Sequence, residues 1–204
     1  MSVVVSTREI GEKELSKINK GEKVGVIGPT GSGKSLLLSL YMENVADKEK
    51  VGYVPQEDSF FSGTIAENIL LKEYANEDLD YSLNMSCFQE VVDIKGGVNE
   101  KLNKNAGNLS TGQKKRLALT RAINKKPELL LMDDVTNPLD MITEKQVLDN
   151  VLQSDMSVVI ATQKPSAVMR SDRIIVIDNG KLGNWEETIC VRVPLCSRAG
   201  KFCN

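Results

Sequence analysis

The stretch Gly28-Pro29-Thr30-Gly31-Ser32-Gly33-Lys34-Ser35 decides the fold, because its Gly-x-x-x-x-Gly-Lys-Ser spacing is that of a phosphate-binding loop. A β-branched run, 23–27, precedes it, and an apolar run, 35–42, follows it. These flanks predict a buried strand that enters the loop and a helix that leaves it. Glycines let the backbone curl so that successive N–H groups converge on phosphate oxygens, and the helix N-terminus adds partial positive charge.

The chemistry of this loop predicts ATP and Mg²⁺ as ligands. Lys34 supplies an ammonium for the β- and γ-phosphates, and the Ser35 hydroxyl is placed to bind Mg²⁺. The apolar run 129–132 predicts a strand that delivers Asp133 to the same sheet edge as a further magnesium ligand. The simpler alternatives are a glycine-rich turn with an incidental lysine and a strand that ends at an ordinary loop aspartate. The predicted phosphate-binding residues are Gly28, Pro29, Thr30, Gly31, Ser32, Gly33, Lys34 and Ser35.

Composition excludes several classes of function. The chain has 204 residues, 26 Lys+Arg against 28 Asp+Glu, a formal net charge of -2 and no histidine. The length fits one domain, and the near-neutral charge argues against nucleic acid as a partner. The lack of histidine removes histidine bases, Ser-His-Asp triads and histidine metal sites. No signal peptide or apolar run of membrane-spanning length is found, so we expect a reducing cytosolic environment and a membrane role only through a partner.

The rest of the chain alternates strand and helix patterns, which is typical of an α/β domain with a mainly parallel sheet. We expect residues 62–126 to be mostly helical, with a basic amphipathic stretch at 113–122, and a tight Asn-Gly hairpin at 178–181. The predicted fold is a phosphate-loop NTPase whose parallel sheet is flanked by helices, with an inserted helical subdomain at about 62–122 and a reduced antiparallel β part. The further strands are predicted at 50–54, 129–132, 157–162 and 173–177, with a helix around 142–153.

Four further segments, in order, carry a family resemblance over about residues 20–182. Leu109-Ser110-Thr111-Gly112-Gln113 resembles the signature motif of ATP-binding cassette (ABC) ATPases, with Thr111 in place of a glycine. Tyr53-Val54-Pro55-Gln56 is similar to the glutamine loop of that family, and Asn137-Pro138-Leu139-Asp140 to its D-loop. The segment 63–69 resembles the one that follows the glutamine loop in ABC exporters.

The resemblance implies a mechanism and partners. Two such domains pair head-to-tail, so that Ser110, Gly112 and Gln113 of one contact the ATP held by the phosphate loop of the other. Gln56 would sense Mg²⁺ and the attacking water, and its loop would face a membrane-spanning transporter domain. The implied function is therefore an ATP-hydrolysing motor on the cytoplasmic face of a membrane exporter, paired with a second nucleotide-binding domain. For Ser110 a helix N-cap is a second role, compatible with the first.

The chain departs from the family at positions that matter for catalysis. Asp134 stands where active members have a glutamate base, and Gln163 stands where they have a histidine beside the γ-phosphate. Only 22 positions separate Lys34 from Gln56, so the β-hairpin usually found there must be trimmed, and no aromatic residue precedes Tyr41 to stack on adenine. The implied catalytic residues are Lys34, Gln56, Asp134 and Gln163. We expect slow hydrolysis, as in the first nucleotide-binding domain of C-subfamily exporters, which the chain resembles.

The boundaries and the function each leave alternatives. We expect an ABC ATPase domain over residues 1–183 and an unassigned tail over 184–204, where Cys190, Cys196 and Cys203 bind a metal, form a disulfide or remain free thiols. A regulatory module that binds ATP without turnover is one alternative function. A soluble ABC ATPase that serves translation or DNA repair is the other, and the exporter-like segment 63–69 argues against it.

Overall fold

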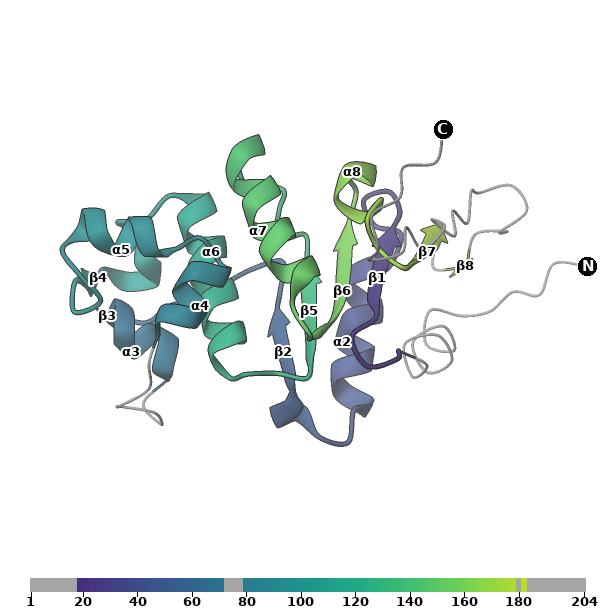
Figure 1. Cartoon of the computed structure of the whole chain (residues 1–204), viewed down its shortest axis with the longest axis horizontal. Helices are drawn as coiled ribbons and strands as arrows, with labels where there is room; N and C mark the ends of the chain where they lie inside the picture. Colours follow the sequence, from purple (N-terminus) through teal and green to yellow (C-terminus); the bar gives the residue numbers. More distant parts are fainter. Residues whose placement is uncertain (1–17, 72–78, 179–180, 183–204) are drawn as a thin grey trace, which may run out of the picture.

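A computed structural model describes residues 18–71, 79–178 and 181–182 of the chain. Within these residues the main sheet has the order β2-β5-β6-β1-β7-β8 (Figure 1). Neighbouring strands are parallel except for β8, which runs antiparallel to β7 and pairs Asp178 with Lys181. The predicted hairpin at this point is therefore confirmed. The strands are β1 (Lys23–Ile27), β2 (Val51–Val54), β5 (Leu129–Asp133), β6 (Ser157–Thr162), β7 (Arg173–Asp178) and β8 (Lys181–Leu182).

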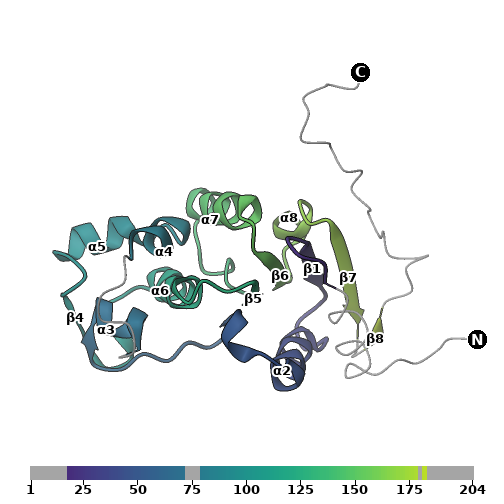
Figure 2. The ribbon, with the colours of Figure 1, turned by 60° about the horizontal axis from the view of Figure 1, so that its bottom comes forward.

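The central strands are buried on both faces, which explains why they read as continuous apolar runs. Successive side chains of a strand point to opposite faces of a sheet. Along β5, Leu129 and Leu131 belong to one apolar cluster, whereas Leu130 and Met132 belong to the other. The first cluster includes Leu37 of α2 (Lys34–Asn44), and the second is formed with α6 (Thr111–Asn124), α7 (Met141–Gln153) and α8 (Pro165–Val168). Figure 2 shows α2 on one side of the sheet and α7 and α8 on the other.

The region between β2 and β5 forms a separate helical group beside the sheet (Figure 1). It contains α3 (Ile65–Leu70), α4 (Asp80–Met85), α5 (Gln89–Lys95), the 3₁₀ turn η3 (Lys104–Ala106) and α6. A two-residue antiparallel ladder, β3 (Gly63–Thr64) with β4 (Lys101–Leu102), closes the group. The mainly helical prediction for 62–126 is confirmed, and the short ladder is an addition that the sequence pattern did not indicate. The predicted α/β fold is confirmed as well.

The connection from α2 to β2 is short. Between Asn44 and Val51 the only regular element is the 3₁₀ turn η2 (Lys48–Lys50). No strand pair lies there, as the 22-residue spacing between Lys34 and Gln56 predicts. Because β1, β2, β5 and β6 run parallel, their carboxyl ends lie at one edge of the sheet, and that edge is where parallel α/β sheets bind ligands.

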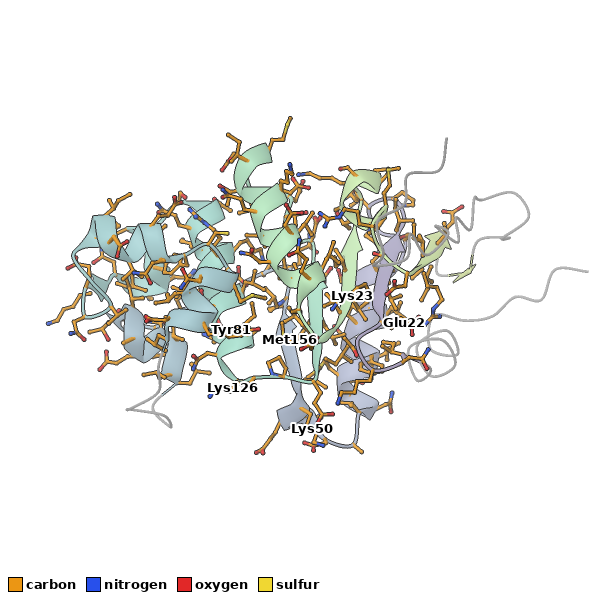
Figure 3. All side chains as sticks on the ribbon, in the orientation of Figure 1. Glu22, Lys23, Lys50, Tyr81, Lys126 and Met156 are labelled. Carbon is orange, nitrogen blue, oxygen red and sulfur yellow. The ribbon has the colours of Figure 1, made fainter. Side chains whose placement is uncertain are left out.

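The opposite edge of the sheet is held by buried charges. The Lys23 ammonium, at the start of β1, donates to the carbonyl of Ser154 at 2.9 Å and to that of Met156, just beyond α7. Arg173 Nε, at the start of β7, lies 2.9 Å from Glu22 Oε1. Figure 3 shows Glu22, Lys23 and Met156 together at this end of the strands. These contacts fix the strand starts against the end of α7.

In the part of the chain that the structure describes, no helix combines the length and the apolar composition that a membrane crossing requires.

Candidate nucleotide-binding site

The glycine-rich loop joins β1 to α2 at the carboxyl edge of the sheet. Gly31 and Gly33 have φ values of 76° and 106°, which lie in the left-handed region that glycine adopts without steric cost. Gly33 is also the N-cap of α2, and no side chain caps the helix there. The first N–H groups of α2 are therefore free of a side-chain acceptor and suited to an anion.

Lys34 closes the loop. Its ammonium donates to the carbonyls of Gly28 and Pro29 at 2.8 Å each. Burial lowers the pKa of Lys34, and the nearby charges of Asp134 and Asp133 oppose that decrease. The ammonium therefore lies between the loop and two carboxylates, where it can meet phosphate oxygens and their metal ion.

Gly28 has no room for a side chain. A Cβ at this position would lie 2.1 Å from the carbonyl oxygen of Ile177 in β7 and 2.6 Å from Ser32 Oγ. We expect Gly28→Ala to reduce the free energy of unfolding by about 1–3 kcal/mol or more, because backbone must move to relieve the overlap. Chemical denaturation followed by circular dichroism measures this change.

Gly31→Ala is the matched control, because a Cβ at Gly31 would have no atom within 4 Å. Its cost is limited to placing alanine at a φ of +76°, about 1–2 kcal/mol. A Gly28→Ala protein that is no less stable than the Gly31→Ala protein would contradict the packing argument.

Two aspartates lie at the same edge, Asp133 as the last residue of β5 and Asp134 directly after it. Asp133 is 2 % exposed, and burial raises the pKa of its carboxyl, although the hydrogen bond from the Ser35 side chain opposes that rise. Asp133 Oδ2 and Asp134 Oδ1 are buried and have no hydrogen-bond partner within the described residues. Carboxylate and hydroxyl oxygens are the ligands that Mg²⁺ prefers. Asp133 and Ser35 therefore fit a magnesium ion that is shared with phosphate oxygens.

Asp134 has an unusual backbone conformation. Its φ is 51°, in the left-handed region, and its N–H donates to the carbonyl of Ala161 at 2.8 Å. Aspartate and asparagine tolerate this region better than longer side chains. The structure thus gives a local reason for aspartate at the position where the family resemblance leads us to expect glutamate.

Gln163, directly after β6, contacts the phosphate loop. Thr30 Oγ1 donates to Gln163 Oε1 at 3.0 Å. The next residue, Lys164, lies 2.8 Å from Glu144 of α7 and donates to the Thr136 carbonyl at 3.3 Å. The turn after β6 is therefore tied both to the loop and to the segment that precedes α7.

Gln56 follows β2, the strand beside β5. Val54 of β2 pairs with Met132 of β5. Gln56 lies two residues after Val54 and Asp133 one residue after Met132, so both lie at the carboxyl edge. The Gln56 side chain is exposed, whereas its carbonyl accepts a 2.7 Å hydrogen bond from Lys115 of α6. The sequence offered no signal for this contact, since its two residues are far apart in the chain.

The signature-like segment begins α6. Ser110 is the N-cap: its Oγ accepts from the Gln113 N–H at 3.2 Å, and Gln113 Oε1 accepts from the Ser110 N–H at 2.9 Å. A Cβ on Gly112 would lie 3.0 Å from the Pro138 carbonyl, so this first turn packs against the segment before α7. In Figures 1 and 2, α6 lies in the helical group, apart from α2 and its loop. The structure therefore does not bring Ser110, Gly112 and Gln113 to the chain's own phosphate loop.

The predicted tail, with Cys190, Cys196 and Cys203, lies outside the described residues. Within the described ranges no group of three or more Cys, Asp or Glu side chains is arranged to hold a metal ion by itself, and Cys87 is a free thiol. A magnesium ion at Asp133 therefore needs ligands from the nucleotide as well.

Comparison with known proteins identifies the family. The protein-family model described as "ABC transporter" matches residues 15–137 of the chain. The chain is 35% identical over 184 residues to the uncharacterized ABC transporter ATP-binding protein YfiB of Bacillus subtilis, covering 79% of this chain and 32% of that protein. It is 34% identical over 197 residues to the lactococcin-A transport/processing ATP-binding protein LcnC of Lactococcus lactis, covering 85% and 27%.

A solved structure has the same fold. The structure of a bacterial Atm1-family ABC exporter with ATP bound superposes with a TM-score of 0.73 and 25% identity, covering 82% of this chain and 34% of that one. The chain spans about a quarter to a third of the length of these relatives. The motifs, the fold and these matches together show that the chain belongs to the ABC transporter family.

Proposed function

We propose that the chain is the ATP-binding and ATP-hydrolysing motor domain of an ABC exporter. The observation that carries the proposal is the meeting of Lys34, Ser35 and Asp133 at the carboxyl edge of the sheet, around a glycine-rich loop whose helix N-terminus has no side-chain cap. Relatives named as transport ATP-binding proteins and a structural neighbour with ATP bound support it.

Each site residue has a role in this proposal. The loop from Gly28 to Ser35 binds the phosphates through its N–H groups, and Lys34 contacts the β- and γ-phosphates. Ser35 and Asp133 would hold Mg²⁺, which when bound would polarise the γ-phosphate, and Gln56, after β2, would reach the ion or the attacking water. Asp134 accepts the proton of that water, and Gln163, whose Oε1 accepts from Thr30, donates a hydrogen bond to the γ-phosphate through its amide nitrogen.

We further propose that the working unit is a head-to-tail pair of such domains. Ser110 and Gly112 begin α6, and α6 is separated from α2 in both views of the fold. A helix N-terminus that carries free N–H groups favours an anion. Contact between this segment and a γ-phosphate therefore requires a second nucleotide-binding domain, either a copy of this chain or a related one.

The exporter setting adds a membrane-spanning partner. In this proposal the loop that contains Gln56 faces that partner, and the domain works at the cytoplasmic face of the membrane. The motor domain covers residues 1–183, with the helical subdomain at about 62–122 within it and a separate tail at 184–204. A module that binds ATP without turnover is the second candidate, and the pair of Asp134 and Gln163 favours it.

Sedimentation velocity of the chain with Mg·ATP, with ADP and without nucleotide tests the proposal. We expect a dimer with Mg·ATP and a monomer in the other two conditions, because the γ-phosphate links the two domains. A chain that binds no ATP would refute the motor function. A chain that binds ATP and stays monomeric would refute self-pairing, and if it also fails to hydrolyse ATP the result would favour the binding-only module.

Ser110→Asp is the matched variant for this test. Aspartate is as good an N-cap as serine, so α6 keeps its start, but it places a carboxylate where the partner's γ-phosphate is proposed to lie. We expect ATP binding to be retained and the dimer to be lost. Dimers that persist in this variant would mean that the pair forms through another surface.

A further inference from the structure

The segment 55–60, which contains Gln56, is held in place by α6 rather than by the sheet it leaves. The Lys115 ammonium donates to the carbonyls of Pro55 and Gln56 at 2.7 Å each and lies 2.9 Å from Asp58 Oδ2. An ammonium has three N–H donors, so these contacts use all of them. The Lys115 and Asp58 side chains are each only 7% exposed.

A second cation of α6 holds the end of the same segment. Arg121 donates to the carbonyl of Ser59 at 3.0 Å, and its guanidinium stacks 4.8 Å from the centroid of the Phe60 ring. It also donates to the Asn68 carbonyl in α3 at 2.8 Å. Lys115 and Arg121 therefore bind the two ends of segment 55–60 to one helix, and that helix begins at Ser110.

Removal of Lys115, unlike removal of an ordinary surface lysine, would leave buried polar groups without partners. The two carbonyls would lose their donor, and Asp58 would become a buried carboxylate without its cation. Buried polar groups without partners are costly, so the segment would shift to reach water. A shift of this backbone moves Gln56, because the Gln56 carbonyl is one of the groups that Lys115 holds.

We propose that Lys115, with Asp58, is a positioning residue that sets where Gln56 stands relative to the metal-bound nucleotide. The proposal rests on the proposed ATP-binding function and adds a residue that acts through Gln56 without touching the ligand. It also makes the helix that begins at Ser110 the support of the Gln56 loop. A shift of α6 would therefore move the Gln56 loop through the three contacts that Lys115 makes with it.

The variant that tests this proposal must remove the ammonium without leaving a buried charge. Lys115→Met alone would leave Asp58 unpaired and is expected to lose stability. Lys115→Met combined with Asp58→Leu replaces the pair by apolar side chains of similar volume, a change that buried ion pairs often tolerate. Lys95→Met is the matched control, because the Lys95 ammonium of α5 also donates to a backbone carbonyl, that of Asn108, at 2.9 Å.

The measurement is the dissociation constant of ATP in Mg²⁺ and in EDTA, by calorimetry on the 204-residue chain with each variant checked by circular dichroism. The dissociation constant in EDTA divided by the one in Mg²⁺ reports the metal-dependent part of binding. Groups that orient metal ligands contribute about 10–100-fold to metal affinity, so we expect the double variant to reduce the ratio about tenfold. Binding in EDTA and the Lys95→Met ratio should stay at the level of the unaltered chain.

The Gln56→Ala variant shows whether Lys115 and Asp58 act through Gln56 or through a general effect on the fold. We expect it to reduce the same ratio, and the triple variant with Lys115→Met and Asp58→Leu to reduce it no further, because all three changes act through one side chain. A folded double variant with an unchanged ratio would overturn the proposal, and so would a triple variant whose losses multiply. An unaltered chain that binds no ATP would instead refute the proposed function.

Discussion

Replacing the loop lysine, Lys34→Met, is expected to weaken ATP binding by about 100-fold or more. The ammonium is buried beside two carboxylates and closes the loop by donating to the Gly28 and Pro29 carbonyls. Truncating one partner of a buried, hydrogen-bonded charge pair typically costs about 2–5 kcal/mol, which corresponds to this loss of affinity. Calorimetric titration with Mg·ATP measures it.

Lys48→Met is the control for Lys34→Met. Lys48 is an exposed lysine in the short turn between α2 and β2, at the opposite edge of the sheet from the phosphate loop. Its replacement should leave the dissociation constant unchanged. If a folded Lys34→Met protein binds Mg·ATP as tightly as the unaltered chain, the loop is not the nucleotide site.

Asp134→Glu is expected to raise the rate of ATP hydrolysis on the order of 100-fold. Glutamate is one methylene longer than aspartate, and a misplacement of about 1 Å lowers a catalysed rate by about that factor. Asp134 Oδ1 has no partner within the described part of the chain, so the longer side chain breaks no hydrogen bond of that atom. Phosphate release in a single turnover, with the chain in excess over Mg·ATP, measures the rate.

The same change should reduce stability slightly. Asp134 has a φ of 51°, where glutamate is less favourable than aspartate, so we expect a loss of about 1 kcal/mol in the free energy of unfolding. Asp134→Asn removes the base and should hydrolyse ATP more slowly than the unaltered chain. If the Glu and Asn variants both hydrolyse at the unaltered rate, the residue at 134 is not the base that limits turnover.

The sequence predicted the parallel sheet well because its strands are buried on both faces. Because neither face of these strands meets solvent, runs such as 129–132 and 157–162 show no alternation of polar and apolar residues. The structure confirms both as central strands. The two-residue ladder at Gly63 and Thr64 was missed because a strand of that length has no periodicity. Its pairing depends on residues almost 40 positions away.

Short motifs in the sequence indicate the residues proposed to bind phosphate and metal, but no such motif indicates the residues that hold them in place. Lys115 and Arg116 belong to the predicted basic amphipathic stretch, yet as whole residues they are only 5% and 8% exposed. Arg116 donates to the Cys87 carbonyl and pairs with Glu90. Charge alone did not indicate burial, because the partners are mostly backbone carbonyls, which are present at every position of a sequence.

The strand order has a consequence for the newly made chain as it leaves the ribosome. Among the described strands, β1 lies between β6 and β7, and β2 pairs with β5, so the two strands made first share no ladder. The phosphate loop and Gln56 are therefore synthesised before any strand exists to fix them. β2 gains β5 as a neighbour once translation has passed residue 133, whereas β1 gains β6 only after residue 162. A nascent chain that ends between these two points has the phosphate loop but no neighbouring strand for β1, which leads into that loop.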